Sequence, residues 1–405
     1  MRVLVTNSTL ALRGGTEAYT QDLAAALRRA GHEVAAYSNI LGEAAVDLRA
    51  AGVTVVDHLD AAPWVPDILH CHHNPEAMTA LLHFGGVPAV FVSHGWSGWL
   101  DAPFLHPRVL RYVAVDGPTR DAMIGRHGIP ASRVRLVPNF VDLDRFRPRA
   151  PLPAVPRRAL VFSHYAREDT HVPVVREACR RANLDLDVAG YGMGQPIRRP
   201  EQVLGEYDIV FAKGRAALEA VAVGAAVVVC DTFGLGPLVT SGNVDVLRTL
   251  EGDYMRYYTP LGVDALVREI GRYDPADAGA VTRRVRKVAG ADSIIPVLVG
   301  LYEETRAEVT ALAPDIDAES RAAAAYLRWM SKHVKERMVE RDPLAGLAIR
   351  LRNRLARVPF LVPLLLRMSA TIQKRWPARG TPGHVEAVDR SQAGGRPADR
   401  GLRQP

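Results

Sequence analysis

The sequence predicts an α/β protein with two doubly wound parallel-sheet domains, followed by a basic helical tail. Three observations predict this fold. Short, continuous apolar runs alternate with amphipathic helical patterns through residue 310, which is typical of parallel sheets covered by helices on both faces. A proline-rich break at residues 147–158 interrupts the alternation and is typical of a linker. The length of 405 residues suits two to three domains.

The first predicted domain covers residues 1–150. It begins with a strand at residues 2–6, and two glycines, Gly14 and Gly15, precede a helix whose apolar residues recur at helical spacing until Gly31. Because ligands bind at the carboxyl ends of strands in such sheets, we expect a site along that edge. Further strands are expected at residues 33–38, 53–58, 67–73, 87–95, 111–117 and 134–139.

The second predicted domain covers residues 151–310 and repeats the alternation. Two such halves joined by a linker face each other across a cleft, which is a usual place for a small-molecule site. A basic helical extension at residues 311–376 and a disordered tail at 377–405, rich in Gly, Pro and Arg, are expected to follow. The second domain's strands are expected at 158–164, 184–190, 207–214 and 225–231, and its helices at 172–183, 215–224, 263–271 and 293–309.

The positive charge is concentrated near the C-terminus. The net charge of the chain is +7, but residues 321–380 alone carry +11, so the remainder is slightly acidic. Few aromatic residues lie among these charges, so no nucleic-acid partner is predicted. The apolar stretch at 359–368 is flanked by arginines, and we expect either that residues 321–376 bind an anionic membrane surface or that this helix packs on the first domain.

The N-terminus and the cysteines bear on the compartment. Polar residues interrupt the first apolar run, which therefore does not resemble a signal peptide. Three cysteines lie far apart in apolar surroundings, which is typical of a reducing compartment. We expect a cytoplasmic protein, which would be peripheral on the inner membrane face if the basic tail binds a membrane. The cysteines are Cys71, Cys179 and Cys230.

Two motifs indicate chemistry at the edge of the first sheet. Gly14 and Gly15, between a strand and a helix, would let the backbone approach a phosphate at the helix N-terminus; a plain tight turn is the alternative. His94 follows an apolar strand and could orient a hydroxyl or a sugar, the alternative being a capping role. No metal is predicted, because only two side chains of HCHH at 70–73 share a face of a strand.

The order of these motifs resembles the retaining glycosyltransferases of the GT-B fold, and particularly the family-four type related to sucrose and glycogen synthases. The most specific match is VPNFVDLDRFRP at residues 137–148, in which Phe140 replaces the family's usual glycine. The resemblance covers about residues 1–310 and leaves out the basic tail. It implies two Rossmann-like domains, the first on the acceptor side and the second binding the nucleotide-sugar donor.

The resemblance also implies roles for individual residues. His94 matches the histidine near the transferred sugar, and Glu219 matches the glutamate that contacts the donor's ribose. The family's other glutamate is replaced by Phe211, and its usual pair of cations is represented by Arg167 alone, so Lys213 and Arg215 are expected to stabilise the leaving phosphate. An ordinary surface ion pair between Arg215 and Glu219 is the alternative. The predicted catalytic residues are therefore His94, Lys213 and Glu219, and the predicted donor-binding residues are Gly14, Gly15, Asn139, Arg167, Gly214 and Arg215.

The resemblance implies transfer of a sugar from a nucleoside diphosphate sugar to a hydroxyl acceptor with retention of anomeric configuration. The acceptor is a carbohydrate, a lipid-linked molecule or a small molecule, and the reaction is expected to need neither a metal nor another cofactor. Two alternatives remain open. One is a nucleotide-sugar epimerase of the same fold, and the other is a noncatalytic binding protein.

Overall fold

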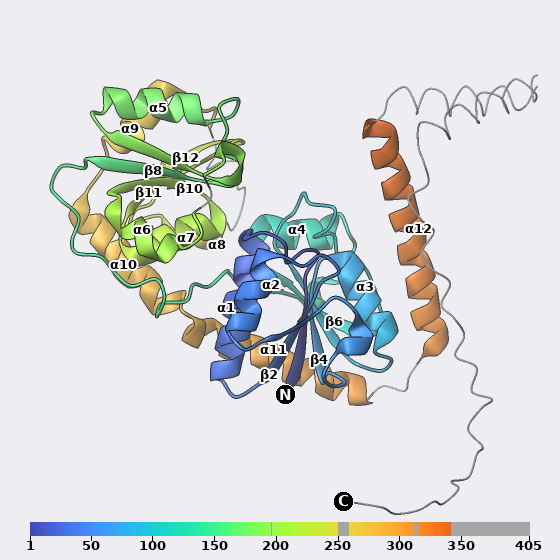
Figure 1. The fold of residues 1–405 in the computed structure, drawn as a ribbon. Coiled ribbons are helices and arrows are strands. Elements are labelled where there is room, and N and C mark those ends of the chain that lie inside the picture. The colour runs from blue at the N-terminus through green and yellow to red at the C-terminus, as the bar shows by residue number, and fades with distance from the viewer. Residues whose placement is uncertain (196, 250–258, 312–314, 342–405) are drawn as a thin grey trace, which may run out of the picture. The chain divides into compact units, whose positions relative to one another are not determined.

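The computed structural model describes residues 1–195, 197–249, 259–311 and 315–341 (Figure 1). Residues 1–326 form one compact unit, and residues 327–405 belong to a second unit. The predictions for 342–376, including the apolar stretch at 359–368, and for the tail at 377–405 lie outside the described residues.

The first sheet has seven strands in the order β3-β2-β1-β4-β5-β6-β7, and every neighbouring pair is parallel. Each predicted strand is present, because each apolar run is long enough to cross a sheet that helices cover on both faces. The strands are β1 (Arg2–Thr6), β2 (Glu33–Tyr37), β3 (Thr54–Val56), β4 (Ile68–His72), β5 (Ala89–Ser93), β6 (Val109–Ala114) and β7 (Val134–Leu136).

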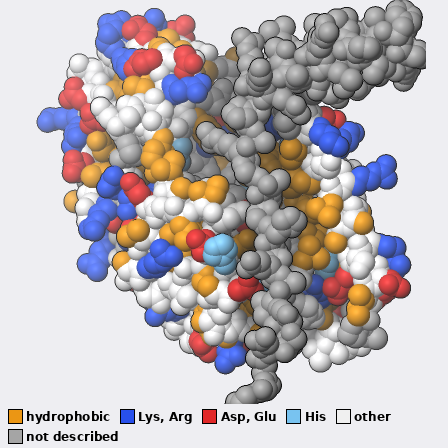
Figure 2. Space-filling model, turned by 45° about the vertical axis from the view of Figure 1, so that its right-hand side comes forward, with side chains coloured by type: hydrophobic (Ala, Val, Ile, Leu, Met, Phe, Trp, Pro, Cys, Tyr) orange, Lys and Arg blue, Asp and Glu red, His pale blue; other side chains and the backbone are white. Residues whose placement is uncertain are grey.

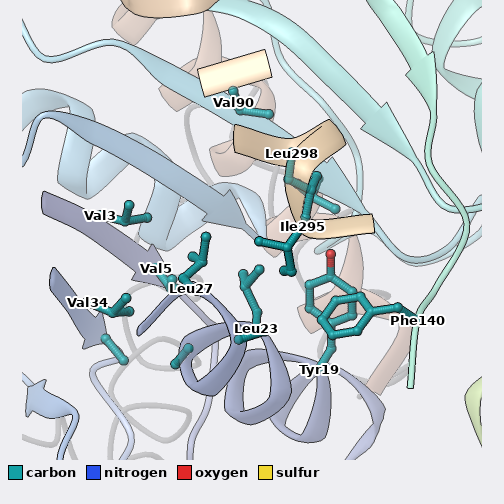
Figure 3. Packing of buried hydrophobic residues seen from close by; sticks show 14 of the residues in the cluster. Val3, Val5, Tyr19, Leu23, Leu27, Val34, Val90, Phe140, Ile295 and Leu298 are labelled. Atoms are coloured by element: carbon teal, nitrogen blue, oxygen red, sulfur yellow. The ribbon is translucent and has the colours of Figure 1, made fainter. Parts of the chain in front are cut away.

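Helices cover both faces of this sheet. On one face α1 and α2 share a core with alternate strand residues, and on the other face α3 and α4 do so. In Figure 3 the rings of Tyr19 and Phe140 lie against each other beside Leu23 in the first of these cores. The helices are α1 (Gly15–Arg29), α2 (Glu43–Ala50), α3 (Asn74–His83) and α4 (Gly117–Gly125), with short 3-10 turns at η1 (Leu59–Ala61) and η2 (Ala131–Arg133).

The second sheet has five strands in the order β12-β11-β10-β8-β9. Four strands are parallel, as predicted, and β12, which was not predicted, pairs antiparallel with β11 at the edge. The predicted fold class, two α/β domains built on parallel sheets, is therefore confirmed. The strands are β8 (Arg158–Phe162), β9 (Asp185–Ala189), β10 (Ile209–Ala212), β11 (Ala226–Asp231) and β12 (Gly234–Leu238).

Helices again lie on both faces. One core contains side chains of α7 and α10, and the opposite core contains those of α5 and α9. The predicted linker at 147–158 contains no helix or strand until β8 begins. The helices are α5 (Val172–Arg181), α6 (Pro200–Val203), α7 (Gly214–Val223), α8 (Val244–Thr249), α9 (Val263–Ile270) and α10 (Pro275–Val288), with 3-10 turns at η3 (Tyr191–Met193) and η4 (Leu204–Glu206).

The helix α11 (Ala291–Ala311) returns to the first sheet. Its residues Ile295, Leu298 and Tyr302 are buried in the core that α1 forms with β1 and β5, and Figure 3 shows Ile295 and Leu298 within that packing. The last predicted helix is thus present, and it completes the core of the sheet that begins the chain.

The final described helix, α12 (Ile316–Arg341), confirms that a helical segment follows the two sheets. Within the first unit, the Tyr326 hydroxyl donates to Asn74 Oδ1 at 3.0 Å, and Glu319 pairs with Arg108 at 2.9 Å. On the face shown in Figure 2, basic and acidic side chains are interspersed. No helix in the described part of the chain is both long and apolar enough to cross a membrane.

Candidate functional site

The loop between β1 and α1 carries Gly14 and Gly15. A Cβ atom on Gly14 would lie 2.3 Å from Glu17 Oε2, so glycine is required there for the Glu17 carboxylate to fold over the helix N-terminus. The Thr16 hydroxyl donates to Glu17 Oε2 at 3.1 Å, and burial raises the pKa of Glu17 against the opposing effect of nearby backbone N–H groups. The N-terminus expected to receive a phosphate therefore holds a carboxylate of the chain itself.

His94 lies just beyond the carboxyl end of β5, as predicted. Its Nε2 is 2.8 Å from His72 Nδ1, its backbone N–H donates to Asp101 Oδ1 at 3.1 Å, and the Tyr19 ring packs against it with centroids 4.6 Å apart. Burial lowers the pKa of His94 to about 3; neighbouring histidines and Arg215 act in the same direction, and a hydrogen bond with Asn139 opposes them. His94 is therefore a neutral imidazole near pH 7.

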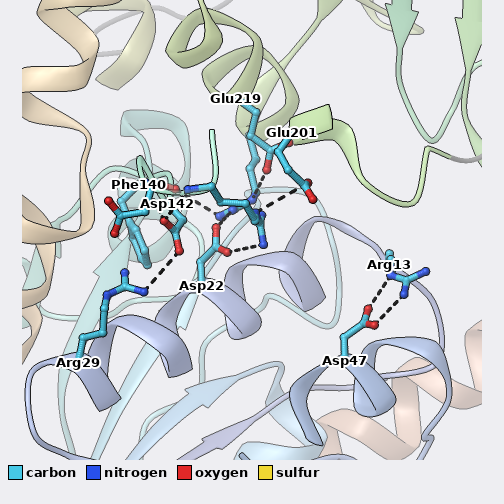
Figure 4. A network of polar contacts seen from close by, with 11 residues as sticks. Arg13, Asp22, Arg29, Asp47, Phe140, Asp142, Glu201 and Glu219 are labelled. Carbon is cyan, nitrogen blue, oxygen red and sulfur yellow. Dashed lines mark hydrogen bonds and ion pairs between the residues drawn. The ribbon is translucent and has the colours of Figure 1, made fainter. Parts of the chain in front are cut away.

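Arg215 and Glu219 belong to a buried ion cluster that links residues of the two domains; Figure 4 shows its members Glu219, Glu201 and Asp22. Arg215 Nε donates to Glu219 Oε1 at 2.8 Å, and Arg215 also pairs with Asp22 of α1. Arg145 adds a second cation, 3.0 Å from Asp22 Oδ1. The Arg215 and Glu219 side chains are only 9% and 6% exposed, so the alternative of a surface pair does not describe them.

Burial dominates the electrostatics of this ion cluster. It raises the pKa of Glu219, which the neighbouring Asp22 raises further and which Arg215 and Arg145 lower. The Arg215 guanidinium also donates to the backbone oxygen of Phe140 at 3.3 Å, which places it beside Asn139. The two cations are thus held by acids from both domains.

A pocket of about 130 Å³ lies beside the cluster. Asp116 and Asn139 line it from the first domain, and Gly214, at the N-terminus of α7, lines it from the second. Gly214 has φ +54°, a left-handed conformation that favours glycine. We call this the Asn139 pocket; its remaining lining is Val115, Ala217, Leu218, Val221, Val229, Pro237, Val239, Val244, Leu247, Arg248 and Val285.

Lys213 and Arg167 have other partners. Lys213 lies directly after β10, where its ammonium pairs with the buried carboxylate of Asp231 and sits 4.5 Å from the centroid of the Phe233 ring. Arg167 follows β8 and pairs with Asp169 at 2.8 Å, with its side chain 58% exposed. The structure therefore brings five predicted residues together, and it places Lys213 and Arg167 in separate ion pairs. The five are His94, Asn139, Gly214, Arg215 and Glu219.

The burial of position 211 explains why it holds phenylalanine and not an acid. Phe211 lies within β10, and its side chain is fully buried in the core on the α5 face of the second sheet. Glu219, by contrast, lies on α7, whose neighbouring residues pack on the opposite face. An acid at 211 would be buried in an apolar core without a partner, at a prohibitive cost.

Sequence reasoning missed three residues that contact the predicted site residues, namely Tyr19, Asp22 and Asp231. Asp22 carried a usable signal, because it lies three residues after Tyr19 on the face of α1 that also carries Leu23 and Ala26. An acid on an apolar helix face is unusual unless it has a partner. Asp231 ends a continuous apolar strand, which is the type of position that predicted His94.

The described residues contain no group of three or more His, Cys, Asp or Glu side chains arranged to hold a metal ion. His70 and His72 do share one face of β4, and Cys71 packs in the opposite core. His73 leaves the strand with φ +60°, and its Nδ1 accepts the Ser8 N–H at 3.0 Å.

Comparisons with known proteins agree with the fold. Residues 13–145 match the family model described as Glycosyltransferase Family 4. A glycosyltransferase from Rickettsia africae ESF-5 superposes with a TM-score of 0.55 at 14% identity, covering 75% of this chain and 98% of that one. Anabaena HepE in complex with UDP gives a TM-score of 0.54 at 14% identity, covering 75% and 100%.

A second structure of Anabaena HepE, in complex with UDP and glucose, gives a TM-score of 0.53 at 14% identity, covering 76% of this chain and 99% of that one. No curated protein matches the chain. The two parallel sheets and these likenesses show that the chain has the GT-B fold.

Proposed function

We propose that the chain is a glycosyltransferase that moves a sugar from a nucleoside diphosphate sugar to a hydroxyl acceptor. The observation that carries this proposal is the convergence of His94 and Asn139, at the edge of the first sheet, with Gly214 and Arg215, at the start of α7. The match of residues 13–145 to Glycosyltransferase Family 4 supports it.

Donor binding uses the start of α7. The free N–H groups of that helix N-terminus and its positive dipole end favour a diphosphate, and Lys213, whose side chain is 35% exposed, can turn from Asp231 to phosphate oxygens. Arg215 is already buried beside Asn139. These cations stabilise the leaving diphosphate as it gains charge. Direct donor contacts are least favoured for Gly14, Gly15 and Arg167. The Glu17 carboxylate lies against the Gly14 backbone, and Asp169 already pairs with the Arg167 guanidinium.

We also propose retention of anomeric configuration. Retention requires that the acceptor hydroxyl approach the same face of the sugar that the diphosphate leaves. A neutral His94 near the Asn139 pocket is placed to hold the sugar by a hydrogen bond, and no metal is needed for the residues to act in this way. Enclosure of the sugar between two domains would exclude water that could hydrolyse the donor.

The first test is a panel of nucleotide sugars screened by thermal shift, since a true donor stabilises the folded state by linkage. UDP sugars are the first members, because HepE was crystallised with UDP and glucose. Release of nucleoside diphosphate that depends on an added carbohydrate or lipid-linked acceptor supports the transferase. Turnover without an acceptor indicates the epimerase, and donor binding without turnover indicates a binding protein.

A second test concerns Lys213. Lys213→Ala should raise donor KM or lower kcat at least tenfold, as expected if one phosphate contact worth about 1.4 kcal/mol or more is lost. Lys287→Ala, at an exposed lysine of α10, is the matched control. Kinetics of Lys213→Ala that equal those of the control would remove Lys213 from the site.

We further propose that the protein acts in the cytoplasm and that residues 321–376 bring it to an anionic membrane surface. In the described part of this segment, α12 carries the basic residues Arg328, Lys332, Lys335 and Arg337. Sedimentation with liposomes that contain anionic lipid should deplete the full chain and spare a chain that ends at residue 326. Equal sedimentation of both would exclude the segment as a membrane contact.

A further inference from the structure

A row of buried imidazoles runs behind His94. Because side chains alternate along a strand, His70 and His72 lie on the same face of β4, and both are fully buried. Their ring centroids are 4.7 Å apart, and the centroids of His72 and His94 are also 4.7 Å apart. The row ends at the α11 residue Tyr302, whose hydroxyl is 2.5 Å from His70 Nδ1.

These rings are neutral. Burial lowers the pKa of His70 and of His94 to about 3, and burial together with the neighbouring imidazoles lowers the pKa of His72 well below its usual value. A neutral imidazole carries one N–H and one bare nitrogen. The contact of 2.8 Å between His94 Nε2 and His72 Nδ1 therefore contains one proton, which belongs to one ring or the other.

The surroundings of His72 distinguish the two arrangements. Its other nitrogen, Nε2, is buried without a hydrogen-bond partner among the described residues. If His94 donated, His72 would have to carry its own proton on this Nε2, as a buried and unsatisfied N–H. If His72 donates from Nδ1, only a bare lone pair is buried. Orphaned buried N–H groups are rarer than under-used acceptors, so His72 is the donor.

The proton on His94 then follows. Its Nε2 accepts from His72, so its own proton sits on Nδ1, the nitrogen that is free to face Asn139. Since Nε2 is occupied by His72, the hydrogen bond between His94 and the Asn139 side chain uses the Nδ1–H as donor and the amide oxygen as acceptor. Asn139 in turn lines the pocket between the domains.

We propose that His72 is a positioning residue that fixes His94 as a hydrogen-bond donor, with its N–H directed at the Asn139 pocket. The proton position stands on its own; its use in catalysis rests on the proposed function. A ring held in this way cannot remove a proton from an acceptor hydroxyl, since one nitrogen is protonated and the other is occupied. It donates a hydrogen bond to an oxygen of the bound substrate.

The test is ¹⁵N NMR of the full chain labelled selectively at histidine, since protonated and bare imidazole nitrogens differ clearly in ¹⁵N shift. Loss of signals in His94→Gln assigns His94. The wild-type protein should show His94 protonated on Nδ1. His72→Asn keeps an N–H donor at the δ position, because Asn Nδ2 is bonded to Cγ as His Nδ1 is, and should preserve that pattern. His72→Leu should release the proton to a mixture of both nitrogens.

Kinetics give a second readout. His72→Leu should lower kcat about tenfold, the effect of one lost hydrogen bond, with little change in donor KM. His72→Asn, which keeps the donor, should have a kcat close to that of wild type. A wild-type His94 that is protonated on Nε2, or a pattern unchanged in His72→Leu, overturns the proposal. A protein without turnover on any donor counts against the proposed function alone, because the NMR result decides the proton position independently.

Discussion

Substitution of Asp22 by asparagine tests the buried ion cluster. Asp22 is 1% exposed, and its carboxylate pairs with Arg215 and lies 3.0 Å from Arg145. The amide of asparagine keeps the shape and one acceptor but removes the charge, so both guanidiniums lose their closest acid. The free energy of unfolding should therefore fall.

The magnitude follows from the burial. Removing one partner of a buried pair costs about 3–5 kcal/mol. Two terms reduce this cost here: the amide still accepts a hydrogen bond, and repulsion between Asp22 and Glu219, which raises the pKa of Glu219, is relieved. We expect a loss of about 2–4 kcal/mol, which for a unit of 326 residues lowers Tm by about 3–6 °C.

Chemical denaturation followed by circular dichroism measures the change, and Asp245→Asn is the matched control. Asp245 pairs with Arg284 at 2.7 Å, but both side chains are 56% exposed, so its loss should cost no more than about 0.5 kcal/mol. Equal destabilisation by the two substitutions would refute the reasoning. It would mean that the cluster is solvated in solution.

Three further predictions concern buried groups. Burial lowers the pKa of His73 to about 4, so the unfolded chain takes up this proton first and the free energy of unfolding falls as the pH drops below about 6.5. His73→Asn keeps an acceptor for the Ser8 N–H, and between pH 7.5 and 5.5 its free energy of unfolding should fall by about 1.4 kcal/mol less than that of wild type. The exposed control His58→Asn should follow wild type. Tyr302→Phe should cost about 1 kcal/mol in urea denaturation by removing the hydroxyl bonded to His70, and no loss would place that hydroxyl elsewhere. Native protein should resist iodoacetamide until unfolded, because burial raises the pKa of every cysteine to about 12, and rapid native labelling would contradict this; the three are Cys71, Cys179 and Cys230.

The sequence predicted the strands and their parallel arrangement because each apolar run is continuous and is bounded by turn residues. It did not predict β12, whose residues GLGPL include two glycines and Pro237. Such residues have low strand propensity, and they are tolerated here because β12 is an antiparallel edge strand. These residues form a strand only because they pair with β11, and that pairing forms in the tertiary structure.

The candidate site was predictable in part for the same reason. His94, Gly214 and Arg215 follow strands, so sheet topology alone brings them to one edge. The partner of Arg215 was not predictable, because Asp22 lies 193 positions earlier in the chain and only the tertiary fold brings the two side chains together. Likewise, nothing in the local sequence indicates that Tyr302 would reach His70, 232 positions away.

The return of α11 to the first sheet affects the order in which the protein can be made. A nascent chain that has just passed the linker contains all seven strands of the first sheet, yet it still lacks Ile295, Leu298 and Tyr302, which fill the core beneath β1 and β5. On the ribosome, that apolar face stays uncovered until residues 159–290, about a third of the chain, have been synthesised. The seven-stranded sheet is the first to be translated, and it is the last to be completed.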